Sequence, residues 1–246
     1  MSNSVAVITG GSRGIGAATA HVFAKNGYDI AITYRTDEIR VKETEKQLSK
    51  LGVKVLVLQA DLAVESEVQD LFKNIMAEFG QVNVLVNNAG GADVSGLLLE
   101  TSYKDWLTVF NSNVFSAVLC AKEAGKIMQQ QEEIGRIINI ASVLGEQYGG
   151  REGAIAYSAA KAAIINFTQT LAKDFAPKIL VNAVSPGRTH TPYYDTMTEE
   201  KREMLKSANV IERFITPLEI AETIYFVSQN DAMAGETVTV GGGFFL

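Results

Sequence analysis

A glycine-rich turn between a strand and a helix near the N-terminus limits the possible folds more than any other stretch. Residues 5–9 read Val-Ala-Val-Ile-Thr, an apolar and largely β-branched run typical of a buried parallel strand. Residues 10–16 follow as Gly-Gly-Ser-Arg-Gly-Ile-Gly, and Ala17, Ala20 and Phe23 then have helical spacing. In such a turn the glycines permit close approach to the backbone, and the N–H groups of the helix N-terminus attract phosphate. The pattern therefore favours a pyrophosphate-binding turn over a plain turn.

Strands and helices alternate along the rest of the chain. Repeated alternation with connections of a few residues predicts an α/β fold, a single Rossmann-type doubly wound parallel sheet with helices on both faces. With 246 residues and no break in composition, we expect one domain over residues 1–246. Apolar runs predict further strands at 29–34, 53–58, 82–86, 137–142, 179–183 and 237–240, and helical patterns occupy 38–51, 64–79, 111–130, about 157–175 and 217–228.

Side-chain caps mark three helix starts. Ser102 with Asp105 opens one helix, and Thr216 with Glu219 has the spacing of a capping box. Asp37 follows the second predicted strand, and we interpret it as the N-cap of the next helix.

Composition and charge exclude several classes of function. Hydrophobic residues make up 47% of the chain and the net charge is −6, which argues against a nucleic-acid partner. No apolar run reaches the roughly 18 residues of a membrane span, and residues 1–4 leave no room for a secretory signal, so a cytoplasmic protein is expected. Cys120 is the only cysteine and is expected to be buried. With only His21 and His190 besides it, no metal site is expected.

A tyrosine and a lysine lie four residues apart in the predicted helix near residue 160. At that spacing Tyr157 and Lys161 share one face of the helix. A lysine cation beside a phenol favours the phenolate and lowers the pKa of the tyrosine from about 10. Such a tyrosine can exchange a proton with a carbonyl or alcohol oxygen. Taken alone, the spacing also fits a surface pair.

The remaining motifs support the chemical interpretation, because together they resemble the short-chain dehydrogenase/reductase family over nearly the full chain. The similarity is to the branch that includes 3-oxoacyl-carrier-protein reductases. Residues 9–16 fit the cofactor motif of the family, and residues 87–90, Asn-Asn-Ala-Gly, fit its sheet-stabilising motif, although the two amides could also simply cap backbone groups. Ser142 and the Tyr-Ser-Ala-Ala-Lys run from Tyr157 fit its catalytic core. Asn113 matches its fourth catalytic residue, and Pro186-Gly187 with Thr191 fits the segment that meets the nicotinamide carboxamide.

The resemblance implies the reduction of a carbonyl group by hydride transfer from a nicotinamide. It implies that Tyr157 donates a proton to the carbonyl oxygen while Ser142 hydrogen-bonds that oxygen. Lys161 would lower the pKa of Tyr157 and bind the nicotinamide ribose, and Asn113 would hold a water. The cofactor-binding residues that it implies are Gly10, Ser12, Arg13, Gly14, Ile15, Gly16, Tyr34, Arg35, Asp61, Leu62, Asn88, Ala89, Gly90, Tyr157, Lys161, Pro186, Gly187, Thr189 and Thr191.

The end of the second strand determines the expected cofactor. A carboxylate there accepts the 2′-hydroxyl of NAD, whereas arginine binds the 2′-phosphate of NADP. The strand places Tyr34 where the acid would stand, with Arg35 beside it and Arg13 in the glycine-rich turn. We therefore expect NADP, with NAD as the alternative.

The resemblance implies a small carbonyl compound or alcohol as the substrate, and we expect its identity to depend on two loops, at about 145–153 and 188–210. The first carries Tyr148 and Arg151 and is longer than is usual in the family, which leaves the shape of the substrate entrance open. A polyol or hydroxysteroid dehydrogenase that uses NAD is an alternative, as is a sensor or scaffold that binds the dinucleotide without turnover. All four catalytic positions are filled, which argues against the sensor.

Two further expectations concern partners. The resemblance implies a homo-oligomer, most simply a homotetramer, helped by apolar faces of the two long helices and by the closing residues 244–246, Phe-Phe-Leu. Family members that act on carrier protein dock it through basic residues, whereas residues 128–133 here read Met-Gln-Gln-Gln-Glu-Glu and only Lys173 and Lys178 remain near the second docking place. We therefore expect little gain from the carrier protein itself. Residues 240–243, Val-Gly-Gly-Gly, lack the acid common in the family, which leaves the contacts of the tail open.

Overall fold

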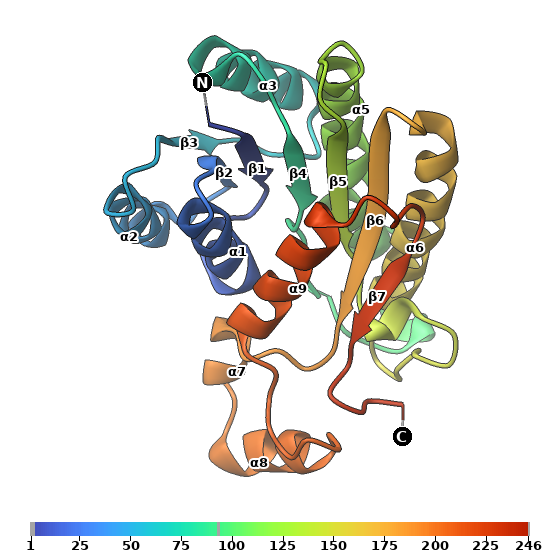
Figure 1. The fold of residues 1–246 in the computed structure, drawn as a ribbon. Coiled ribbons are helices and arrows are strands. Elements are labelled where there is room, and N and C mark those ends of the chain that lie inside the picture. The colour runs from blue at the N-terminus through green and yellow to red at the C-terminus, as the bar shows by residue number, and fades with distance from the viewer. Residues whose placement is uncertain (1–2, 93, 246) are drawn as a thin grey trace.

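Seven parallel strands form one sheet in the order β3-β2-β1-β4-β5-β6-β7. The computed structural model describes residues 3–92 and 94–245, with the side chain of residue 193 left out. The strands are β1 (Val5–Ile8), β2 (Asp29–Tyr34), β3 (Val55–Gln59), β4 (Val84–Asn87), β5 (Gly135–Ile140), β6 (Ile179–Pro186) and β7 (Thr237–Val240). The chain adds β2 and β3 on one side of β1 and then adds β4 to β7 on its other side (Figure 1). The strand order therefore reverses between β1 and β4. This confirms the predicted doubly wound sheet.

Helices cover both faces of the sheet (Figure 1). The α-helices are α1 (Gly14–Lys25), α2 (Glu38–Ser49), α3 (Glu65–Phe79), α4 (Tyr103–Phe110), α5 (Ser116–Met128), α6 (Ile155–Phe175), α7 (Pro192–Asp195), α8 (Glu199–Ser207) and α9 (Pro217–Gln229). Short 3₁₀ turns form η1 (Leu98–Glu100) and η3 (Val143–Gly145), and η2 (Asn111–Phe115) is a π-helical turn.

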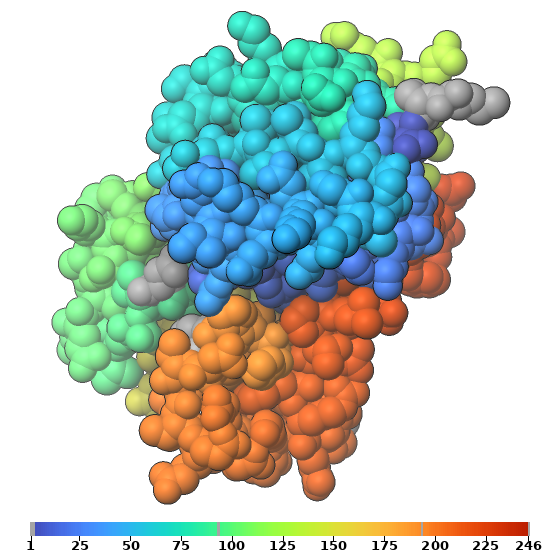
Figure 2. Space-filling model, turned by 90° about the vertical axis from the view of Figure 1, so that its left-hand side faces the viewer, coloured from blue at the N-terminus to red at the C-terminus, as the bar shows by residue number. Residues whose placement is uncertain are grey.

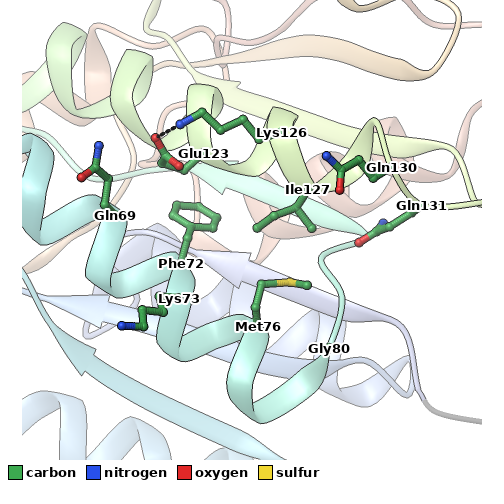
Figure 3. Close-up of a pocket in the computed structure, with 10 residues that line it drawn as sticks. All are labelled: Gln69, Phe72, Lys73, Met76, Gly80, Glu123, Lys126, Ile127, Gln130 and Gln131. Atoms are coloured by element: carbon green, nitrogen blue, oxygen red, sulfur yellow. Dashed lines mark hydrogen bonds and ion pairs between the residues drawn. The ribbon is translucent and has the colours of Figure 1, made fainter.

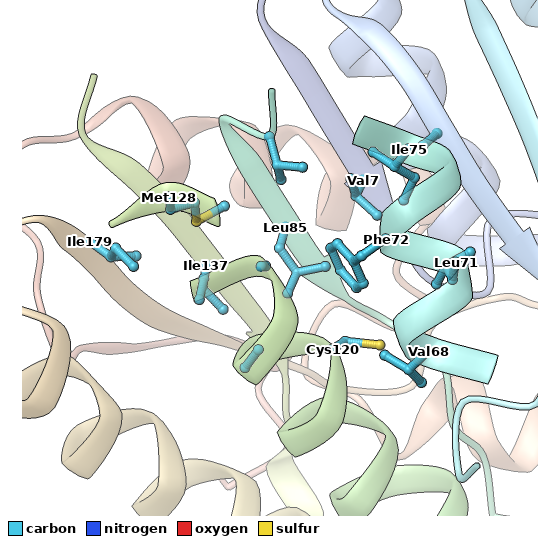
Figure 4. Close-up of a cluster of buried hydrophobic side chains, with 14 of the residues drawn as sticks. Val7, Val68, Leu71, Phe72, Ile75, Leu85, Cys120, Met128, Ile137 and Ile179 are labelled. Atoms are coloured by element: carbon cyan, nitrogen blue, oxygen red, sulfur yellow. The ribbon is translucent and has the colours of Figure 1, made fainter. Parts of the chain in front are cut away.

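Alternating side chains of the strands fill two separate cores. Val7, Leu85 and Ile137 point to the face covered by α3, α5 and α6, where Phe72 and Cys120 are buried with them (Figure 4). Their neighbours in the strands point to the other face, where they pack against α1, α2 and α9. Burying both faces explains why the strands read as continuous apolar runs. The burial of Cys120 confirms its predicted place in the core.

All three predicted caps are present. The Asp37 carboxylate accepts a hydrogen bond from the backbone N–H of Arg40 at the start of α2. Ser102 with Asp105 and Thr216 with Glu219 form capping boxes at α4 and α9.

Several element boundaries and one loop differ from the prediction. The third, fourth and fifth strands each start two residues from their expected starts, and the π-helical turn η2 occupies the beginning of the helix predicted over 111–130. The segment 188–210, expected to be a loop, folds into α7 and α8. It forms the orange lobe beside the blue N-terminal part of the chain in Figure 2. Helix α8 buries no residue, so no apolar stripe marks it in the sequence.

A chain of buried polar side chains joins the sheet to α6. The Asn87 amide at the end of β4 donates to the side-chain oxygen of Asn139 on β5, at 2.9 Å. The Asn139 amide donates in turn to the Thr168 hydroxyl on α6, also at 2.9 Å, and Asn87 and Asn139 are register partners. This chain fixes β4, β5 and α6 relative to one another.

Candidate active site

A cavity of about 930 Å³ lies along the carboxyl ends of the first six strands. In an open α/β sheet this edge, at the point where the strand order reverses, is where ligands bind. Of the predicted site residues, Gly16 and Asn113 are not on its wall. The wall contains Gly10, Ser12, Arg13, Gly14, Ile15, Tyr34, Arg35, Asp61, Leu62, Asn88, Ala89, Gly90, Ser142, Tyr157, Lys161, Pro186, Gly187, Thr189 and Thr191.

Two positions in the glycine-rich turn require glycine for different reasons. Gly14 has a left-handed φ of 55°, a conformation that side chains with a Cβ rarely adopt. Gly16 lies behind the cavity wall, where a Cβ would stand 2.3 Å from the Gly10 carbonyl oxygen and 2.5 Å from the Asn88 amide nitrogen. Gly16 therefore permits the tight turn rather than contacting a ligand.

The turn is braced by hydroxyl and amide side chains from neighbouring strands. The Thr9 hydroxyl accepts hydrogen bonds from the backbone N–H groups of Asn88 and Ala89, both at 2.9 Å. The Asn88 side-chain amide donates to the carbonyl oxygens of Thr9 and Gly10, which confirms that it caps backbone groups. The Thr33 hydroxyl accepts from the N–H of Gly10. Thr33 is not marked by any motif, because its role depends on the pairing of β1 with β2.

The N-terminus of α1 carries no side-chain cap and no acidic residue in its first turn. Its backbone N–H groups and its dipole are therefore available to an anion at the cavity wall. At the end of β2, Arg35 is exposed and Tyr34 is partly buried, while Arg13 is the exposed N-cap residue of α1. Asp37 also lies on this part of the wall, but its carboxylate caps α2 and pairs with Arg40 at 3.7 Å.

The first turns of α6 bring the tyrosine and the lysine together as predicted. The Lys161 Nζ lies 5.6 Å from the centroid of the Tyr157 ring. It donates a hydrogen bond of 2.8 Å to the carbonyl oxygen of Ile140 at the end of β5. Because Lys161 is buried, loss of solvation lowers its pKa from 10.5 to about 8. The ammonium is thus held in place by the sheet at an energetic cost.

The fifth strand delivers Ser142 to the same wall. Its hydroxyl oxygen accepts a hydrogen bond of 3.2 Å from the N–H of Leu144, so the hydroxyl hydrogen is left to donate elsewhere. Gly145, in the same 3₁₀ turn, packs against α6, where a Cβ would lie 2.4 Å from the backbone carbon of Lys161. This contact sets the spacing between Ser142 and Lys161.

Asn113 lies in the π-helical turn η2, behind the wall. Its side-chain nitrogen donates to the carbonyl oxygens of Gly91 and Val109, at 2.9 and 3.0 Å. Its side-chain oxygen is buried and has no hydrogen-bond partner among the described residues. A Cβ at Gly90 would lie 2.5 Å from that oxygen, so the Asn113 amide faces the backbone that follows β4. An unpaired buried acceptor of this kind fits a bound water.

The wall also contains residues that no motif predicted, notably Thr36, Arg188, Tyr194 and Phe244. Arg151, noted only as part of an unusually long loop, is on the wall as well. Arg188 and Tyr194 belong to the segment expected to be a loop, and only the fold of that segment brings them to the cavity. No group of three or more metal-ligating side chains is found in 3–92 and 94–245. None of the helices in these two ranges combines the length and apolar character needed to cross a membrane.

Comparison with known proteins places this site in a family. A family model described as Enoyl-(Acyl carrier protein) reductase matches residues 10–245. The 3-oxoacyl-[acyl-carrier-protein] reductase of Synechocystis is 37% identical over 246 residues, which cover 98% of this chain and 97% of the relative. The chain belongs to the short-chain dehydrogenase/reductase family. Within that family it resembles the 3-oxoacyl reductase branch, and it is accordingly an NAD(P)-dependent oxidoreductase.

Solved structures of the short-chain dehydrogenase/reductase family share the whole fold. The actinorhodin polyketide ketoreductase, solved with NADPH, is similar with a TM-score of 0.92 and 30% identity, and the match covers 99% of both chains. A short-chain dehydrogenase of Burkholderia cenocepacia, solved with NADP, gives a TM-score of 0.91 and 32% identity over 100% of this chain and 99% of that one.

The residues present here fit the dinucleotide of the family. A diphosphate suits the uncapped N-terminus of α1 and the left-handed backbone conformation of Gly14 before it. The volume of the cavity leaves room for the two nucleosides. A second hollow, of about 490 Å³, lies between α3 and α5 (Figure 3). Its floor is Phe72, Met76 and Ile127, and the charges of Glu123 and Lys126 on its rim pair with each other. It therefore offers no arrangement comparable to that of Tyr157 and Lys161.

Proposed function

We propose that this enzyme reduces a ketone, a 3-oxoacyl group or a similar small carbonyl compound, to a secondary alcohol with NADPH. The observation that carries the proposal is the meeting of Ser142, Tyr157 and Lys161 on one cavity wall with the glycine-rich turn. The curated relative named a 3-oxoacyl reductase and the polyketide ketoreductase structure favour the same substrate class.

The chain's own residues divide the chemistry between them. When bound, the nicotinamide supplies a hydride to the carbonyl carbon. Tyr157 donates a proton to the carbonyl oxygen, and the free hydroxyl hydrogen of Ser142 stabilises the charge that develops on that oxygen. Lys161 favours the phenolate that remains. With one of its hydrogens on the Ile140 carbonyl, it has two left for ribose hydroxyls. Asn113 holds a water through its unpaired oxygen.

The proposed cofactor contacts lie on the cavity wall, with Gly16 as the structural exception behind it. The glycine-rich turn and the first N–H groups of α1 hold the diphosphate. Asp61 and Leu62 follow β3 and would bind the adenine. Pro186 at the end of β6, with Gly187 and Thr189 after it, would bind the nicotinamide. The segments 145–153 and 188–210 frame the entrance for the carbonyl compound, since Arg151 and Tyr194 come from them.

The enzyme is expected to prefer NADPH to NADH by at least about tenfold in kcat/KM. Arg13 and Arg35 can each form charge-assisted hydrogen bonds to a 2′-phosphate, and such bonds are worth about 1.5–3 kcal/mol. The carboxylate of Asp37 is occupied with α2 and Arg40, so it opposes the phosphate only weakly. The measurement is kcat/KM for both dinucleotides in the parent and in an Arg13→Gln/Arg35→Gln variant. The variant should lose the preference because its kcat/KM falls for NADPH and stays the same for NADH. A parent that favours NADH would contradict the proposal.

The reaction class is tested by following dinucleotide oxidation with a panel of ketones, 3-oxoacyl thioesters and 2-enoyl thioesters. We expect turnover of the carbonyl compounds and none of the enoyl thioesters. Turnover of enoyl thioesters alone would favour the reaction in the description of the family model. Dinucleotide binding without turnover of any compound would favour a sensor, and oxidation of polyols or hydroxysteroids with NAD would favour a dehydrogenase.

A carrier protein is expected to add little to the reaction. The last turn of α5 carries one lysine, Lys126, which pairs with Glu123, and residues 128–133 are neutral and then acidic. Lys178 donates a hydrogen bond to the backbone carbonyl oxygen of Glu132. An acidic surface repels an acidic partner, and salt relieves this repulsion. The measurement is kcat/KM for acetoacetyl-carrier protein against a short acetoacetyl thioester at low and high salt. A carrier-protein advantage above about tenfold, or about 1.4 kcal/mol, that shrinks with salt would contradict this prediction.

The enzyme is expected to be a homo-oligomer, most simply a homotetramer. Phe115, which directly precedes α5, and Phe245 near the C-terminus are exposed, as are Leu218 and Phe226 on α9. Exposed large apolar side chains favour association. Leu246 lies outside the described residues. Light scattering at micromolar concentration should give a multiple of 26.6 kDa, and a monomer mass would reject the prediction.

A further inference from the structure

The charges on the cavity wall are divided between its two ends. Its acidic residues, Asp37 and Asp61, both lie at the ends of β2 and β3, far along the sheet from α6. The end that holds Tyr157 carries Arg151, Lys161 and Arg188, and no aspartate or glutamate among the described residues of the wall. Among the described residues, this end of the wall therefore carries only positive charges. These charges are separate from Arg13 and Arg35, which lie where the adenosine end of the dinucleotide is expected.

Arg151 has no ion-pair partner among the residues that the structure describes. It lies four residues before the start of α6 and is exposed. Within 3–92 and 94–245 its guanidinium makes no hydrogen bond or ion pair, and the first turn of α6 has no acidic residue. A guanidinium in this position is free to bind a planar anion through two parallel N–H donors.

Arg188 is held in place by neutral groups. Its Nη1 donates to the side-chain oxygen of Asn209 at 2.9 Å, and its Cζ lies 5.1 Å from the ring centroid of Phe244. Both partners orient the guanidinium but neither offsets its charge. The residue is partly buried, which strengthens its field inside the cavity relative to that of an exposed arginine.

We infer that the carbonyl substrate is an anion, a short oxo acid whose carboxylate is bound by Arg151 and Arg188 while Tyr157 and Ser142 hold its ketone oxygen. The inference rests on the proposed function and narrows its substrate class. Two guanidinium groups can neutralise one carboxylate, and the positive end of the cavity also draws anions in from solution. A neutral ester of the same skeleton would leave both charges unpaired.

The test compares oxo acids with their methyl esters. Pyruvate, acetoacetate and levulinate place the carboxylate at increasing distance from the ketone, and each has a neutral methyl ester. The ratio of kcat/KM for acid over ester is measured in the parent, Arg151→Gln, Arg151→Lys, Arg188→Lys and Lys50→Gln. Because each variant sees the same pair of compounds, differences in intrinsic reactivity cancel. Lys50 is an exposed C-cap lysine of α2 that does not line the cavity. Lys50→Gln therefore removes one positive charge, as Arg151→Gln does, but away from the substrate.

For at least one chain length the ratio should fall at least about tenfold in Arg151→Gln, mainly through KM. It should recover in part in Arg151→Lys, stay unchanged in Lys50→Gln, and shrink with added salt in the parent. An unchanged midpoint of urea unfolding shows that Arg151→Gln is folded. A ratio that is the same in the parent, Arg151→Gln and Arg188→Lys at all three lengths, with the esters turned over, would overturn this inference alone. Turnover of no carbonyl compound would reject the proposed function and the inference together.

Discussion

The Tyr157→Phe variant is expected to lose about 10²- to 10⁴-fold in kcat, the usual contribution of general acid catalysis. The substitution removes the phenolic hydroxyl and keeps the ring, which lies 5.6 Å from the Lys161 ammonium nitrogen. Because the hydroxyl contributes little to the rest of the dinucleotide site, the affinity for NADPH should change only slightly. The loss should therefore fall on the chemical step.

The measurement is single-turnover kinetics of ketone reduction, together with NADPH binding followed by fluorescence. Tyr103→Phe is the matched control, because Tyr103 is an exposed tyrosine on α4 that does not line the cavity. It should behave as the parent. If Tyr157→Phe keeps more than about a tenth of the parent kcat while chemistry is rate-limiting, Tyr157 is not the proton donor.

Lys161→Met is expected to change how the free energy of unfolding depends on pH. In the folded protein without dinucleotide, the pKa of Lys161 is lowered by burial from 10.5 to about 8. One pKa unit is worth about 1.4 kcal/mol, so the buried cation costs the folded state about 3 kcal/mol at neutral pH. Between pH 8 and 10.5 the unfolded chain keeps this proton while the folded chain releases it. The parent should therefore gain about 3 kcal/mol of stability relative to Lys161→Met as pH rises through this window.

Urea unfolding of both proteins at fixed concentration, at pH 7, 8, 9, 10 and 10.5, gives this difference directly. Both proteins carry the Tyr157→Phe substitution, because Lys161 acts on the pKa of Tyr157. The remaining groups titrate alike in the two proteins and cancel. Lys50→Met, which removes an exposed lysine, should give a difference that does not vary with pH. If the difference in the free energy of unfolding between the parent and Lys161→Met also stays constant from pH 7 to 10.5, burial does not lower the pKa of Lys161.

The sequence predicts those features of this protein that depend on residues close together in the chain. The caps at Asp37, Ser102 and Thr216 are local hydrogen bonds, and each was found where its sequence pattern placed it. The order of the strands and the wall positions of Ser142, Tyr157 and Lys161 follow from family motifs combined with the topology of a parallel sheet.

Features that depend on tertiary contacts were missed. The π-helical turn that holds Asn113 has no signature in apolar periodicity, because it shifts the helix by only part of a turn. Helix α8 is not predicted because it buries no apolar side chain. The place of Arg188 on the cavity wall is not predicted either, because it depends on how the same segment, 188–210, folds. Thr33 braces the glycine-rich turn only once β1 and β2 are paired. In each case the neighbour that gives the residue its role is distant in sequence or lacks a pattern.

The hydrogen-bonded chain Asn87–Asn139–Thr168 bears on how the sheet finds its alignment during folding. Strands β4 and β5 are parallel, so no tight hairpin turn measures their offset, and a connection of 47 residues allows many offsets. A slip of β5 past β4 would set the Asn139 amide against an apolar neighbour, and burying an unpaired amide costs about 1–3 kcal/mol. Folding intermediates with a misaligned β5 are therefore destabilised before the cavity forms. Ser142 lies three residues beyond Asn139, so it reaches the active site only when β5 has the native alignment with β4.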